Sequence, residues 1–139
     1  MNCIFCQIVT GQLPASFVYK DEDCTAFMDI QPVNAGHVLV IPNRHASRLA
    51  EMPERDGSQI FRVAQRIAVA LQRSGIRCQG ANFFLADGEA AGQEVFHVHL
   101  HVFPRFEGDG FGLKFGDRYG MKPERGELDR LAELIKDNL

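Results

Sequence analysis

The 139-residue chain has no tryptophan, and it has no apolar run of the roughly 18 residues that a membrane-spanning helix needs. No lysine or arginine precedes Lys20, so a secretory signal peptide with a basic start is not expected. Its four cysteines are too few and too unevenly spaced for a disulfide framework, so we expect reduced thiols in a cytoplasmic protein. The net charge of −3 gives no general attraction to nucleic acid or to a membrane surface, and neither partner is expected.

What is present is typical of one globular domain spanning residues 1–139, with 45% hydrophobic residues and no internal repeat. Short β-compatible runs predict strands at 17–19, 24–28, 38–41, 82–86 and 95–102. Apolar residues at helical spacing predict a long helix at about 53–74 and a closing amphipathic helix within 128–135. Because strands and helices do not alternate regularly, we predict an α+β fold with an antiparallel sheet. The segment 108–120 contains five glycines and is expected to be mobile unless something packs on it.

Three of the five histidines alternate with apolar residues in the segment 97–102. Side chains on a strand point to opposite faces with period two, so His97, His99 and His101 share one face and the apolar residues share the other. Imidazole is costly to bury without hydrogen-bond partners, so a row of three is hard to explain as packing. The row therefore predicts a chemical site, whereas the single His37 is expected to be a structural residue.

A pair of cysteines, Cys3 and Cys6, stands at the start of the chain with the two-residue gap that allows both thiolates to bind one zinc ion. The histidines available as further ligands are His45, after the 38–41 strand, and His97, the first of the row. A structural zinc site of two cysteines and two histidines is the expectation. A redox pair is less favoured because this pair precedes every predicted strand, and two packed thiols without metal remain an alternative.

The spacing of residues 97–103 matches His-φ-His-φ-His-φ-φ, with φ apolar, and thereby resembles the signature of the histidine-triad (HIT) superfamily. The resemblance extends to Cys-Ile-Phe-Cys at 3–6, Phe-Met-Asp-Ile at 27–30, Gly-His-Val-Leu-Val-Ile-Pro at 36–42 and Gly-Gln at 92–93, and it ends at about Gly108. It is closest to the small nucleotide-hydrolase branch whose members carry zinc on an amino-terminal cysteine pair. The resemblance implies a homodimer in which two sheets join edge to edge.

The family cleaves nucleoside phosphoramidates or dinucleoside polyphosphates at the α-phosphorus, through a covalent nucleotidyl-histidine. Carried onto this chain, the resemblance makes His99 the nucleophile, lets His101 contact the phosphate oxygens and makes His97 a supporting zinc ligand. It also implies a site for a purine nucleotide, with an apolar base slot, a ribose-binding carboxylate and a phosphate loop. The corresponding residues are Phe5, Ile8, Leu13, Phe27 and Ile30 for the base, Asp29 for the ribose, and Gly92 and Gln93 for the phosphate.

Two positions depart from the family pattern. Ala86 stands where many phosphoramidase members have asparagine, and Glu94 stands where they have a serine that can bond a departing amine. The leaving group, the base preference and the physiological substrate are therefore left open. Two other functions are also considered, which are a hydrolase that uses the histidine row to bind a catalytic zinc and a nucleotide-binding module without catalysis.

Overall fold

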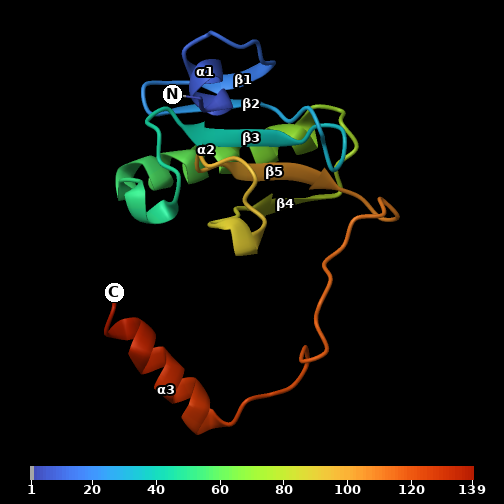
Figure 1. The fold of residues 1–139 in the computed structure, drawn as a ribbon. Coiled ribbons are helices and arrows are strands. Elements are labelled where there is room, and N and C mark those ends of the chain that lie inside the picture. Colours follow the sequence, from blue (N-terminus) through green and yellow to red (C-terminus); the bar gives the residue numbers. More distant parts are fainter. Residues whose placement is uncertain (1) are drawn as a thin grey trace.

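A five-stranded antiparallel sheet with the order β1-β2-β3-β5-β4 forms the centre of the computed structural model, which describes residues 2–139 (Figure 1). Its strands are β1 (Phe17–Lys20), β2 (Cys24–Met28), β3 (Val38–Pro42), β4 (Gly80–Phe84) and β5 (Leu100–Arg105). The helices are α1 (Ile4–Val9), α2 (Glu54–Arg73) and α3 (Arg125–Lys136), with short 3-10 turns at Leu49–Glu51 and Glu89–Ala91. The predicted α+β class, long helix and closing helix are confirmed.

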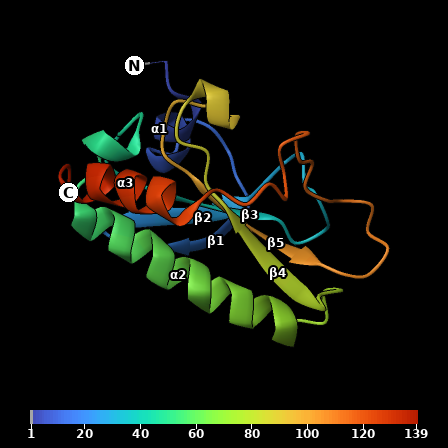
Figure 2. The same cartoon turned by 90° about the horizontal axis from the view of Figure 1, so that it is seen from below.

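Helix α2 covers one face of the sheet (Figure 2). Its apolar residues recur at helical spacing and are buried against the strand residues that point to that face, so the helix forms because it can cover this apolar surface. The buried apolar residues of the helix are Ile60, Val63, Ala64, Ile67 and Leu71. Gly75 follows the helix with a positive φ, which is the usual conformation of a residue that ends a helix.

The opposite face of the sheet carries a second apolar cluster, in which Phe5 and Ile8 of α1 pack on Phe27, Leu39 and Ile41. Helix α1 begins after Cys3, whose sulfur accepts a hydrogen bond of 3.5 Å from the amide of Cys6. No helix was expected here. One turn of helix brings both thiols of the cysteine pair to the same side of α1.

The two later strands differ in position from the expectation. Strand β4 runs over Gly80–Phe84 rather than 82–86, and β5 begins at Leu100 rather than at residue 95. The segment before Leu100 leaves the ladder because its groups find other partners: the amide of Val98 donates to the carbonyl of Ala46 at 2.8 Å. The ring of His97 bonds the carbonyl of Pro42 at 2.8 Å.

The chain after β5 runs away from the sheet, and α3 stands apart from it in Figure 1. Residues 112–124 contain neither helix nor strand. The apolar side of α3 is substantially exposed, with Leu128, Leu131, Leu134 and Ile135 all accessible to solvent. Over residues 2–139, none of the helices has the length and hydropathy required to cross a bilayer.

Candidate functional site

The histidine row lies on the face of the sheet opposite α2, along β5 and the segment before it. His97 and His99 are buried, and the His101 side chain is 19% exposed. The Nδ1 atom of His99 lies 2.7 Å from the carbonyl oxygen of His97. Because a carbonyl can only accept, Nδ1 carries the proton of the neutral ring and Nε2 keeps its lone pair.

A chain of hydrogen bonds also sets the tautomer of His101. The backbone amide of Val33 donates to Nδ1 of His37 at 2.9 Å, so a neutral His37 carries its proton on Nε2. That nitrogen lies 2.9 Å from Nδ1 of His101, which must then accept. His101 is left with an N–H on Nε2, which makes it a hydrogen-bond donor beside the lone pair of His99.

The imidazoles of the row are neutral near pH 7. Burial lowers the pKa of His99, although the bond to the His97 carbonyl opposes this shift, and burial likewise lowers the pKa of His37 against the effect of Asp29. The pKa of His101 falls to about 4, because of burial first and then because of the neighbouring rings of His99 and His37. Neutral rings are the form in which a lone pair is available for attack on phosphorus.

A cleft of about 990 Å³ opens beside the row. Most of the residues carried over from the family line it together. These are Phe5, Ile8, Leu13, Phe27, Asp29, Ile30, Gly92, His99 and His101. The ring of Phe5 packs edge-on against His99 with 5.2 Å between centroids, so the apolar slot reaches the row. Ile30 is 95% exposed and lies at the rim rather than in the slot.

Asp29 and Gln93, two polar residues near the cleft, differ in how far their side chains are already engaged in hydrogen bonds. One oxygen of Asp29 accepts a bond of 2.8 Å from the amide of Gln31, and the other lies 3.5 Å from Nε2 of His37. The side-chain amide of Gln93 is bonded to nearby backbone groups. Its Oε1 accepts a hydrogen bond of 2.8 Å from the backbone N–H of Gly88, and its Nε2 donates one of 2.7 Å to the backbone carbonyl of Ser47. In this conformation Gln93 therefore holds the loop at Gly88–Gln93 and, unlike Gly92, does not line the cleft.

The two departures from the family pattern lie at different depths. Ala86 is buried with 5% of its surface exposed. Glu94 is exposed and lines the cleft. The position that differs from the phosphoramidase pattern in charge is therefore the one that lines the cleft.

Cys3, Cys6, His45 and His97 gather beneath α1, with all four potential ligand atoms within 4.8 Å of one another. The Cys6 sulfur lies 3.3 Å from Nδ1 of His45 and 3.6 Å from Nδ1 of His97, and the Cys3 sulfur lies 3.5 Å from the same His97 atom. Ligands on a tetrahedral zinc ion are separated by roughly 3.3–3.8 Å. These three distances fall in that range, and with all four atoms within 4.8 Å of one another the cluster could hold a zinc ion.

Second contacts orient the two histidines of the cluster. Nε2 of His97 donates to the carbonyl of Pro42, which leaves Nδ1 unprotonated and directed at the thiols. Nε2 of His45 lies 3.3 Å from the hydroxyl of Ser47. Burial and the adjacent Cys3 raise the pKa of Cys6 to about 11, so a bound metal would have to displace a proton there.

Sequence reasoning missed His37 as a member of the site. On β3, Leu39 and Ile41 pack in the cluster on the α1 side of the sheet, while Val38 and Val40 pack in the cluster on the α2 side. His37 has the same parity as Leu39, and β3 pairs with β5 so that Leu39 lies opposite His101. The alternation along β3 was thus the signal that could have placed this ring beside the row.

Comparisons with known proteins show which proteins this chain resembles. The HIT domain family model matches residues 10–108. A solved structure of a HIT family member from Bacillus subtilis superposes with a TM-score of 0.89 at 38% identity, covering 100% of this chain and 98% of that one. A Zn-bound histidine triad family protein from Mycobacterium smegmatis has a TM-score of 0.78 at 40% identity, covering 99% and 98%. An adenosine 5′-monophosphoramidase of Saccharomyces cerevisiae is 31% identical, over 99% of this chain and 80% of its own.

Proposed function

Because the chain belongs to the HIT family, we propose that it is a hydrolase or nucleotidyl transferase that cleaves purine nucleotides at the α-phosphate through a nucleotidyl intermediate on His99. Its substrates would be nucleoside phosphoramidates or dinucleoside polyphosphates. The observation that carries the proposal is the fixed tautomer of His99. Its Nδ1 is bound to a backbone carbonyl, and the ring lines the cleft with its other nitrogen unprotonated.

In the first step, Nε2 of His99 forms a bond to the α-phosphorus, and the bond to the leaving group breaks. The leaving group departs with the electron pair and takes up a proton. In the second step, water displaces the ring, which gives a nucleoside monophosphate and releases the proton that balances the first step. The Nε2–H of His101 supports both steps by donating to a phosphate oxygen as negative charge builds up there.

The nucleotide would lie along the cleft with its base between α1 and β2. Phe5 and Phe27, whose rings pack edge-on at 5.5 Å, offer an apolar wall for a purine. The carboxylate of Asp29 lines the cleft and would accept from a ribose hydroxyl, and Gly92, without a side chain, allows the phosphate to approach the loop backbone.

The same proposal assigns a structural zinc ion to Cys3, Cys6, His45 and His97. The ion would tie α1 to the segment that carries the row, since α1 contributes Cys6 and the row contributes His97. The rings of the row do not share a metal: His97 is directed at the thiols, His99 at a carbonyl and His101 at His37. This geometry argues against the row as a catalytic zinc site.

We expect a covalent adduct when the wild-type protein is mixed with radiolabelled adenosine phosphoramidate or diadenosine triphosphate and quenched in alkali. Phosphoramidate bonds to histidine survive alkali, so the label should remain on the peptide that contains His99. Turnover without any trapped label would contradict the covalent route. Calorimetric binding of AMP together with no turnover of either substrate would favour a binding module instead.

Replacing His37 with alanine is expected to lower kcat by about 10-fold to 100-fold, which is the usual effect of losing a group that orients a functional side chain. His101 would then be free to carry its proton on either nitrogen. Glutamine at position 37 can still donate to His101 and should restore most of the rate. The measurement is steady-state kinetics of both variants with ¹⁵N chemical shifts of His101; an unchanged His101 tautomer in the alanine variant would contradict this assignment.

Homodimer formation through the β4 edge is also part of the proposal. The β1 edge is protected by a register irregularity between Phe17 and Tyr19 and by Lys20, whereas β4 presents an apolar ring, Phe83, that is 36% exposed and packs edge-on with Phe61 of α2. A second copy of this chain can cover this surface symmetrically.

We expect the substitution Phe83→Glu to convert the dimer to a monomer, because it places two like charges at the centre of that interface. The measurement is light scattering after gel filtration. Phe17→Glu is the matched control, because Phe17 is also exposed but lies on the opposite edge. Loss of the dimer in the Phe17 variant, with the Phe83 variant still dimeric, would show that the wrong edge was chosen.

A further inference from the structure

The exposed carboxylate of Glu94 lies in the wall of the cleft. Among residues 2–139, no basic side chain forms an ion pair with it. Its neighbours in the chain are engaged elsewhere, because the Gln93 side chain bonds the backbone of Gly88 and Val95 packs against the apolar cluster beneath α1. The charge of Glu94 is therefore not used to hold the loop together.

The charged side chains that line the cleft, within the described part of the chain, are Asp29 and Glu94, and both are acidic. The imidazoles of His37, His99 and His101 beside them are neutral near pH 7. Sites that bind several phosphate groups usually present arginine or lysine to them. The cleft therefore suits a substrate that brings little negative charge besides its α-phosphate.

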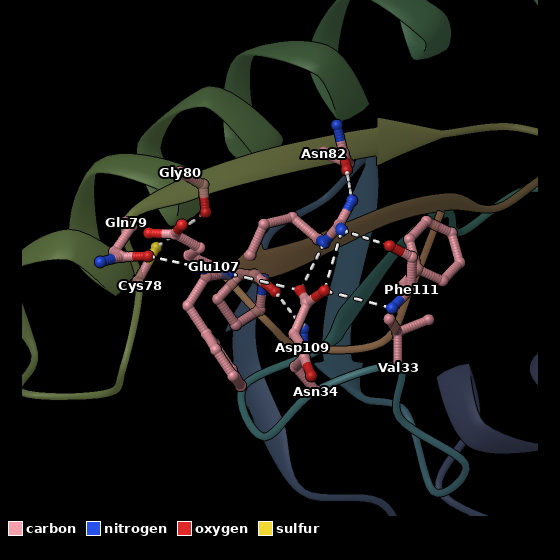
Figure 3. A network of polar contacts seen from close by, with 12 residues as sticks. Val33, Asn34, Cys78, Gln79, Gly80, Asn82, Glu107, Asp109 and Phe111 are labelled. Carbon is pink, nitrogen blue, oxygen red and sulfur yellow. Dashed lines mark hydrogen bonds and ion pairs between the residues drawn. The ribbon is translucent and has the colours of Figure 1, made fainter. Parts of the chain in front are cut away.

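Two arginines next to the cleft are paired with other carboxylates. The guanidinium of Arg105 lies 4.7 Å from the ring centre of Phe111, which lines the cleft, but it is bound to the buried carboxylate of Asp109 at 2.6 Å (Figure 3). Arg48 packs at the start of the loop that leads to the row and pairs with Asp87 at 3.1 Å. Neither arginine offsets the acidic charge of the cleft.

The charge of Glu94 acts at the ring that would attack phosphorus. Burial lowers the pKa of His99, whereas the bond to the His97 carbonyl and the charges of Asp29 and Glu94 oppose this shift. Exposed charges act over roughly 8 Å at physiological ionic strength. A phosphate bonded to His99, and the group that leaves it, would thus lie in the field of the same carboxylate. Because Asp29 is assigned to the ribose, Glu94 is the carboxylate left to act on the leaving group.

We propose that Glu94 is a specificity-determining residue that favours leaving groups with positive charge and disfavours anionic ones. This inference rests on the proposed function and narrows its substrates to nucleoside phosphoramidates of cationic amines. When the P–N bond breaks, nitrogen keeps the electron pair and takes up a proton from water, so an amine departs as an ammonium ion that a carboxylate attracts. A departing nucleoside diphosphate carries several negative charges, which the same carboxylate repels.

The test compares adenosine 5′-phosphoramidates of 1,4-diaminobutane, pentylamine and 5-aminopentanoate, which are similar in length and end in a cationic, a neutral and an anionic group. We expect the wild-type kcat/KM to fall in that order. Glu94→Gln should lower the ratio of the diaminobutane value to the aminopentanoate value about 10-fold, and Glu94→Lys should reverse the order. Added salt should shrink the wild-type ratio more than that of Glu94→Gln, because salt screens exposed charges.

Glu89→Gln is the matched control, because Glu89 is an exposed acid of the same loop that does not line the cleft. It should keep the wild-type ratio. An unchanged ratio in Glu94→Gln, or an equal fall in Glu89→Gln, overturns the proposal while the proposed function stands. Turnover of diadenosine triphosphate but of none of the phosphoramidates does the same. Turnover of none of these compounds removes the proposed function as well.

Discussion

Replacing His99 with alanine is expected to reduce nucleotide turnover by about 10⁴-fold or more, because the variant has no group that can bond to phosphorus. The neighbouring donor on His101 can still polarise the phosphate, but polarisation alone does not supply a nucleophile. The measurement is single-turnover hydrolysis of adenosine phosphoramidate and diadenosine triphosphate. The same variant should leave no labelled nucleotide on the protein after an alkaline quench.

Two controls separate this effect from loss of the fold. The His99 ring contacts only the rings of Phe5 and His101 in the cleft wall, both of which remain in the variant, so AMP binding by calorimetry should weaken only modestly. The melting temperature should remain near that of the wild type, because the bond from His99 to the His97 carbonyl is a local one. Wild-type turnover in a folded His99→Ala protein would exclude His99 as the nucleophile.

The fold could be predicted because it depends on short-range periodicity, and the helical spacing from Ile60 to Leu71 identifies the surface that covers one face of the sheet. The period of two in 97–102 predicts three imidazoles on one strand face; His99 and His101 line one cleft, whereas His97 and His99 precede β5 and His97 is directed at the thiols. The metal ligands could be proposed because so few cysteines and histidines are present. The structure brings all four together, which the sequence alone could not establish.

The contacts that sequence analysis missed are those between segments distant along the chain. His37 joins His101 across 64 residues, and Asn34 joins Asp109 across 75, so no local pattern reports either pair. The onset of β5 was misplaced for a similar reason. The alternation of 95–102 is typical of a strand, but the partner of Val98 is the carbonyl of Ala46, which lies outside the sheet.

Glu94 is a departure from the family pattern that lies in the wall of the cleft. The exposed carboxylate lines the cleft, whereas the family pattern has a hydroxyl at this position. Gln93, the preceding residue, is bound to the backbone of Gly88 and Ser47, so it fixes the loop from which Glu94 projects. The loop is therefore held in place, but it carries a negative charge where the phosphoramidase members have a serine. We expect this difference to change which substrates the protein accepts.

Removing zinc is expected to destabilise the chain strongly while sparing the chemistry of His99. A ligand that binds only the folded state at about 1000 times its Kd contributes about 4 kcal/mol to the free energy of unfolding. For a domain of this size, that loss corresponds to a fall in Tm of roughly 10–15 °C. Cys6→Ser should therefore purify with little zinc and melt at a correspondingly lower temperature, as measured by metal analysis and calorimetry.

Cys78→Ser is the matched control, because Cys78 is also partly buried and its thiol donates to the carbonyl of Gly80, far from the cluster. It should keep about one zinc ion per chain and a nearly unchanged Tm. The proposed zinc ligands lie at α1 and beneath it, and His99 uses a separate carbonyl for its orientation, so chelated protein that is still folded should retain turnover. Complete loss of turnover in folded, chelated protein would instead support a metal that acts in the reaction itself, and zinc-free wild-type protein with full stability would exclude the structural site.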